Sequence, residues 1–151
     1  MNNIEKFLAH AIELERDAAR RFEELAAAMG TDGNAELKEF FGRMAHYSRK
    51  HLAQAVERGG YREVPHMKPE DFEWPDGTSP ETAAWAGVDA FMDERGALEL
   101  ALESERRGHA WYAAVAATTQ NPEVRVLAAE FVEEEAEHVE LLEKLLAARP
   151  A

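Results

Sequence analysis

Cysteine is absent from all 151 residues of the chain. Without a thiol the chain can form no disulfide, no thiolate zinc site, no cysteine nucleophile and no cysteine-ligated iron–sulfur centre. The absence also agrees with a reducing compartment.

Basic residues are scarce: 17 Lys and Arg stand against 30 Asp and Glu, for a net charge of −13. Because nucleic acids and anionic lipids are polyanions, this charge argues against general affinity for either, whereas metal cations or basic partners agree with it. No apolar stretch approaches the length that spans a bilayer, and the first ten residues, MNNIEKFLAH, lack the features of a signal peptide. We therefore expect a soluble cytoplasmic protein with no nucleic-acid and no membrane partner.

Apolar residues recur at alternating spacings of three and four along most of the chain. This periodicity predicts helices over residues 4–29, 35–58 and 93–119, and a fourth helix from Pro122 almost to the C-terminus. Prolines and glycines interrupt the pattern over residues 59–92, which is long enough for a crossover along a bundle. The expected fold is all-α, with the whole chain as a single four-helix bundle of two antiparallel hairpins.

The crossover carries its own structural signals. Phe72, Trp74 and Trp85 indicate that it lies against the bundle, since a free linker rarely holds such large apolar side chains. Ser79 followed by Pro80 has the pattern of an N-cap and a first-turn proline, which predicts a short helix over residues 80–91.

Two polar residues interrupt the apolar stripe of the fourth helix. Glu135 and His138 stand three residues apart, between Phe131 and Leu142, so both side chains can reach one point inside a bundle. The helical neighbours of Glu135 include no Lys or Arg, and a buried carboxylate is costly unless a cation or a hydrogen-bond partner meets it. The pattern favours a metal site.

The other helices are interrupted in the same way at mid-length. Glu15 occupies the middle of the first stripe and Glu105 the middle of the third, each without a Lys or Arg three or four positions away. The second stripe contains Ser48 and His51, again three apart. Two helices each supply one glutamate and two supply a pair that ends in histidine, which is the ligand arrangement of di-iron carboxylate bundles.

The two halves of the chain also resemble each other, with AIELERDAARRFEELA in the first half matching ALESERRGHAWYAAVA in the second. This match aligns Glu15 with Glu105. Between the second helices of the two halves, His51 aligns with His138, and Ser48 opposite Glu135 is the one mismatch at the proposed site. On these motifs the chain resembles the rubrerythrin branch of the ferritin-like superfamily of di-iron carboxylate proteins, over essentially its whole length.

The resemblance implies two bound iron ions, with zinc or manganese as alternative metals. The ligands that it implies are Glu15, His51, Glu105, Glu135 and His138. His109 is a further candidate ligand. The family pattern has a glutamate where this chain has Ser48, so one bridging carboxylate is missing. Three glutamates against two divalent ions leave a surplus positive charge, which hydroxide, an exogenous anion, a single-metal site or an extra ligand must balance.

As a function, the resemblance implies an oxidoreductase that acts on peroxide, oxygen or ferrous iron. Rubrerythrins carry a cysteine-ligated iron module, which these residues lack, so the electron donor would be a separate molecule. A homodimer is compatible with the resemblance. Two alternatives stay open: a non-catalytic metal-binding or iron-handling protein with a weakened site, and a metal-free structural bundle.

The remaining polar residues of interest are predicted to lie at the surface. These are His10, His66 and the acidic residues Glu133, Glu134, Glu137 and Glu140. Tyr112 is predicted to pack in the core, where its hydroxyl can donate a hydrogen bond to a ligand carboxylate.

Overall fold

The computed structural model describes residues 1–58, 64–75, 77, 79–80 and 93–149. Four long helices and one short 3₁₀ turn make up its regular structure: α1 (Ile4–Thr31), α2 (Ala35–Arg58), η1 (Pro69–Asp71), α4 (Glu94–Thr118) and α5 (Pro122–Ala147). The described residues contain no strand. No helix among them is both long enough and apolar enough to cross a membrane. Of the short helix predicted over residues 80–91, all but residue 80 lies outside the described residues.

Side-chain caps fix where the helices begin. The side chains of Asn3, Asp93 and Asn121 accept hydrogen bonds from backbone N–H groups in the first turns of α1, α4 and α5. Asn34 caps α2 in the same way, through the N–H of Leu37 at 3.0 Å. The predicted boundaries are therefore correct to within a residue or two, as expected where the sequence supplies its own cap.

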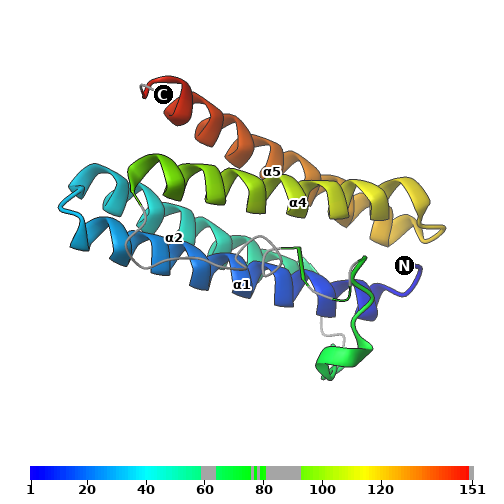
Figure 1. The fold of residues 1–151 in the computed structure, drawn as a ribbon. Helices are drawn as coiled ribbons and strands as arrows, with labels where there is room; N and C mark the ends of the chain where they lie inside the picture. The colour runs from blue at the N-terminus through cyan, green and yellow to red at the C-terminus, as the bar shows by residue number, and fades with distance from the viewer. Residues whose placement is uncertain (59–63, 76, 78, 81–92, 150–151) are drawn as a thin grey trace.

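Figure 1 shows two antiparallel hairpins, α1 with α2 and α4 with α5. The figure also shows α2 and α4 running in the same direction, so the chain must return along the bundle between them. This arrangement confirms the predicted all-α bundle with a long crossover.

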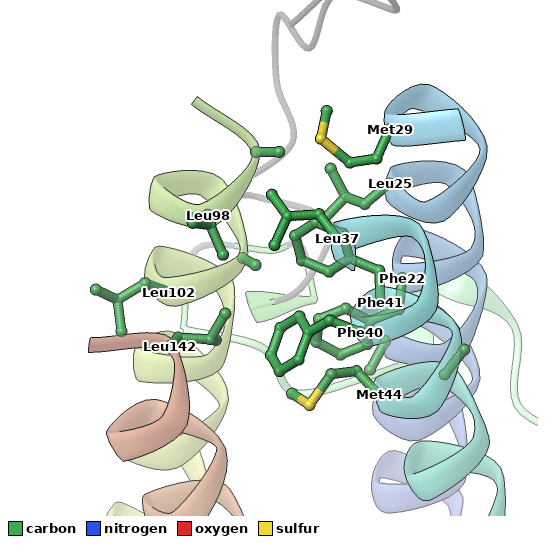
Figure 2. Packing of buried hydrophobic residues seen from close by; sticks show 14 residues of the cluster. Phe22, Leu25, Met29, Leu37, Phe40, Phe41, Met44, Leu98, Leu102 and Leu142 are labelled. Atoms are coloured by element: carbon green, nitrogen blue, oxygen red, sulfur yellow. The ribbon is translucent and has the colours of Figure 1, made fainter. Parts of the chain in front are cut away.

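The apolar core consists of two clusters at different levels of the bundle. The first lies toward the turn between α1 and α2 and is drawn in Figure 2; its large members are Phe22, Leu25, Met29, Leu37, Phe40, Phe41, Met44, Leu98, Leu102 and Leu142. The second lies toward the chain's N-terminus and contains Ile4, Phe7, Leu8, Leu14, Trp111, Tyr112, Val115, Val124, Leu127 and Phe131. On every helix, the residues between the two clusters include the polar interruptions of its stripe. The bundle therefore holds one polar layer between two apolar ones.

The described part of the crossover packs on α1 through His10, which is fully buried. The ring of His10 lies 4.8 Å from that of Trp74 and 5.7 Å from that of Trp111. Its Nε2 accepts a hydrogen bond from the N–H of Glu73 at 2.8 Å, while Nδ1 lies 2.8 Å from the carbonyl oxygen of Lys6. The prediction of a surface position for His10 is wrong, because the crossover covers this face of α1. His66 is exposed, as predicted.

Candidate metal centre

The polar layer contains residues from all four long helices. Glu15, Ser48, Glu105 and Glu135 are each 1% exposed, and His138 is 5% exposed. The side chain of His51 is 14% exposed, so it lies at the edge of the layer. Every ligand that the resemblance implies is therefore buried or nearly so. A surface position for these carboxyl groups would have excluded a buried metal centre.

Three of these residues form a compact group. Glu105, Glu135 and His138 each offer one ligand atom, and these atoms lie within 4.8 Å of one another. Nδ1 of His138 is 3.6 Å from Oε2 of Glu105. The group joins α4 to α5, and its members come from two of the four helices.

Two polar atoms of this group have no hydrogen-bond partner in the described part of the chain. Oε2 of Glu135 and Nδ1 of His138 are buried, and neither has a hydrogen-bond partner among the described residues. Buried side-chain polar atoms are nearly always paired, so two unpaired ones in contact distance of a third ligand atom call for an explanation. A cation between them would satisfy both.

Burial also shifts the acidity of the carboxyl groups. Loss of solvent and then the neighbouring charge of Glu105 raise the pKa of Glu135 well above 4.5. Loss of solvent and then the charge of Glu135 do the same to the pKa of Glu15, while the hydrogen bond from Tyr112 opposes the shift. The charges that act most strongly on these acids thus come from other acids. A bound cation would reverse this effect and favour the carboxylate form.

His51 lies beside His138, on the facing helix α2. The two rings are nearly parallel, with centroids 5.5 Å apart. Burial, followed by the nearby His138, lowers the pKa of His51 from 6.5 to about 4. His51 is therefore neutral at pH 7 and keeps a lone pair that can bind a metal.

An acid that was expected in solvent reaches the same histidine. Oε2 of Glu134 lies 3.4 Å from Nδ1 of His51, and the Glu134 side chain is only 25% exposed. The prediction of a solvated Glu134 is therefore wrong. The three-and-four spacing places position 134 one residue from the apolar stripe of α5. Whether its side chain reaches the polar layer therefore depends on how α5 is rotated relative to α2. Glu133, Glu137 and Glu140 are exposed, as predicted.

Glu15 enters the layer from α1 and is held by α4. The hydroxyl of Tyr112 donates a hydrogen bond to Oε1 of Glu15 at 3.2 Å. This contact confirms the predicted role for the Tyr112 hydroxyl. Glu15 does not belong to the compact group of three, although the charge of Glu135 acts on it.

The two remaining positions behave differently. Ser48 is buried in the layer three residues before His51, so a longer side chain at this position would point toward the same space. His109 is half-buried and does not belong to the compact group. The structure thus brings together the interruptions that the sequence predicts and leaves His109 beside them.

The donor set suits a hard or borderline divalent metal. Carboxylate oxygens and neutral imidazole nitrogens bind iron, manganese and zinc, and the described residues contain no thiolate that would favour softer metals. The residues present therefore fit the metal that the resemblance implies.

Comparison with known proteins adds an independent observation. The family model described as Rubrerythrin matches residues 6–64, which include Glu15 and His51. A crystal structure of an uncharacterized conserved protein from Magnetospirillum magnetotacticum MS-1 is 36% identical and superposes with a TM-score of 0.81. The similarity covers 99% of this chain and 97% of that one. No curated protein matches the sequence. The chain therefore belongs to the rubrerythrin-like proteins of the ferritin-like superfamily.

Proposed function

We propose that the protein binds two iron ions in its polar layer and acts as an oxidoreductase on peroxide, oxygen or ferrous iron. One observation supports this most directly: carboxyl and imidazole groups from different helices meet in a buried layer, where Glu135 and His138 each hold a polar atom without a hydrogen-bond partner among the described residues. The burial of such groups is costly unless a cation compensates it.

The protein's residues would bind and orient the metal. Glu105, Glu135 and His138 are arranged to hold one ion, and Glu15 and His51 approach the same layer from α1 and α2. The hydrogen bond from Tyr112 fixes the orientation of the Glu15 carboxyl group. The two apolar clusters, which lie on either side of the polar layer along the bundle, keep bulk water out of it. Bound iron would supply the one-electron redox chemistry, which no side chain of this layer can supply alone.

Electrons would come from a donor outside these 151 residues, because none of them is a cysteine that could hold a second iron module. The negative charge of the protein, −13 overall, favours a donor or a metal-delivery partner with a basic surface.

A second candidate function is a non-catalytic protein that holds a single ion. It is favoured by the compact group itself, which supplies three ligand atoms within 4.8 Å of one another from Glu105, Glu135 and His138 alone. It is also favoured by Ser48, which cannot bridge two ions as a carboxylate would.

Metal content and turnover separate these candidates. Metal-free protein is loaded anaerobically with ferrous iron, desalted, and assayed for iron per chain; hydrogen peroxide or oxygen is then added and the absorbance of ferric iron is followed over repeated cycles of reduction. Two irons per chain with repeated turnover support the oxidoreductase. One stable iron without turnover supports the single-ion protein. A folded protein that binds no iron rules out the di-iron oxidoreductase, and one that binds neither iron, manganese nor zinc rules out both.

A further inference from the structure

A fourth carboxylate, that of Glu134, lies next to His51 of α2. Nδ1 of His51 and Oε2 of Glu134 are 3.4 Å apart, and Nδ1 is buried without a hydrogen-bond partner among the described residues. An N–H···O hydrogen bond is usually about 2.7–3.2 Å long, so this pair is more widely spaced than one. No hydrogen bond joins these two atoms, although they lie within ion-pair distance.

Their spacing instead agrees with two ligands of one ion. Donor atoms about 2.1 Å from a shared metal are roughly 3.0–3.6 Å apart when the angle at the metal is about 90–120°. The pair formed by His138 Nδ1 and Glu105 Oε2, at 3.6 Å, belongs to the compact group and has nearly the same spacing. The layer therefore contains two pairs of a histidine and a glutamate, and the rings of the two histidines are stacked on each other.

The surroundings of Glu134 provide space for an ion. Beside His51 and Glu134 is a small pocket with room for about one water-sized group, and Gln54 and Glu130 also line it. Glu134 lies close enough to Glu15 for its charge to act on that carboxyl group. The pair is thus within electrostatic reach of an acid from α1, and it opens toward the surface through the partly exposed side chain of Glu134.

The charge of the layer leads to the same assignment. Glu15, Glu105 and Glu135 carry three negative charges when ionised, whereas two divalent ions carry four positive ones. Ser48 supplies no charge at the position where the related family has a glutamate. Glu134 would supply the fourth negative charge from the neighbouring helix and make the loaded layer neutral.

We propose that Glu134 takes the place of the carboxylate missing at Ser48 and completes, with His51, a second divalent-cation position beside the group of Glu105, Glu135 and His138. This inference rests on the proposed di-metal function. It assigns to Glu134 a ligand role that the residue pattern along α5 does not predict.

The test counts bound ions in matched variants of the full chain. Metal-free wild type, Glu134→Gln and Glu133→Gln are titrated anaerobically with ferrous iron, and iron per chain is measured after desalting. Glu133 is the neighbouring exposed acid, so its variant removes the same charge from the same turn of α5. We expect two ions in wild type and in Glu133→Gln. Glu134→Gln should keep one ion and bind the second at least about tenfold more weakly. A loss of affinity of about tenfold is the lower end of the range seen when a hydrogen-bond partner of a metal ligand is removed.

A rescue variant tests the substitution directly. Ser48→Glu in the Glu134→Gln background restores a carboxylate to the layer from α2, and circular dichroism verifies that the double variant is folded. Recovery of the second ion supports the exchange of roles between positions 48 and 134. A double variant that still holds one ion would overturn it.

The outcomes also separate this inference from the function on which it rests. Two ions in both wild type and Glu134→Gln, with equal affinities, overturn the role of Glu134 and leave the di-metal function standing. One ion in wild type overturns the second position and favours the single-ion protein. No iron in wild type removes the di-metal function itself, and the role of Glu134 with it.

Discussion

The hydroxyl of Tyr112 on α4 donates a hydrogen bond to Oε1 of Glu15 on α1, at 3.2 Å, in the buried middle of the bundle. The ring of Tyr112 is stacked on Phe131 with centroids 4.6 Å apart, so the hydroxyl is held in place by packing on α5. Tyr112 therefore connects the apolar cluster toward the N-terminus with Glu15, a candidate metal ligand on the other hairpin.

Tyr112→Phe should lower the free energy of unfolding of the metal-free protein by about 1–2 kcal/mol, because the packing of the ring is kept while a buried hydrogen bond is lost. Urea denaturation measures the change. Tyr47→Phe is the matched control, since Tyr47 is 42% exposed. Equal losses in the two variants would mean that the hydroxyl of Tyr112 contributes nothing specific to Glu15.

Glu135→Gln should affect the metal-free and the metal-loaded protein in opposite directions. Folding raises the pKa of Glu135, so at pH values above 4.5 the buried carboxyl group costs stability, and the cost grows as the pH rises toward the folded-state pKa. A neutral amide removes this cost and should raise the free energy of unfolding of the metal-free protein at pH 7 by about 1–3 kcal/mol. The same change removes a metal-binding side chain, so iron should no longer stabilise the variant. In wild type, iron present at a hundred times its Kd should stabilise the protein by about 2.7 kcal/mol.

Thermal denaturation with and without anaerobic ferrous iron measures both effects. Glu137→Gln on the exposed face of α5 serves as the control and should leave both melting temperatures unchanged. A Glu135→Gln variant that still gains stability from iron to the full extent would exclude Glu135 as a ligand.

Much of the fold follows from the periodicity of the sequence. Apolar residues at spacings of three and four can only be buried together on one face of a helix, and Asn3, Asn34, Asp93 and Asn121 mark where the helices start. The buried acids could be predicted for the same reason: a glutamate in the middle of an apolar stripe must enter the core. The stripe does not depend on the partner helix, so the prediction needs no tertiary information.

The two misplaced residues, His10 and Glu134, depend on tertiary contacts. His10 is buried by Trp74, which is more than sixty residues away in the sequence, and nothing in the local pattern of α1 predicts which face the crossover covers. Glu134 is one position from the stripe, so its exposure depends on how α2 and α5 are rotated about their own axes. Local periodicity determines neither which face of α1 the crossover covers nor how α2 and α5 are rotated about their axes.

Leu98→Ala should destabilise the protein by about 2–5 kcal/mol, the usual cost of deleting a buried leucine side chain. Leu98 is fully buried in the cluster of Figure 2, where it faces residues of the other hairpin. Leu141→Ala, at a 44% exposed position, is the control and should cost much less. Urea denaturation compares them, and a similar small loss at both positions would show that the hairpins are not held together through this cluster.

His10 should make the stability of the metal-free protein depend on pH. Burial lowers its pKa from 6.5, and its Nε2 accepts a hydrogen bond from the N–H of Glu73, so the folded state requires the neutral ring. As the pH falls below 6.5, the unfolded chain takes up a proton at this residue and the folded chain does not; stability is therefore lost as the pH falls toward the lowered folded-state pKa. The carbonyl oxygen of Lys6 and the charge of Glu73 favour the charged ring, and the charge of the Lys6 side chain opposes it, but burial outweighs them.

His10→Phe keeps an aromatic ring and removes the titrating group. It should cost about 1–3 kcal/mol at pH 7, because the Glu73 N–H loses its partner, and it should flatten the pH profile below pH 6.5. Urea denaturation at a series of pH values, with His66→Gln as the exposed control, measures the difference. Since His51 and the buried acids titrate in both proteins, their contributions cancel, and parallel profiles for wild type and His10→Phe would contradict the requirement for a neutral His10.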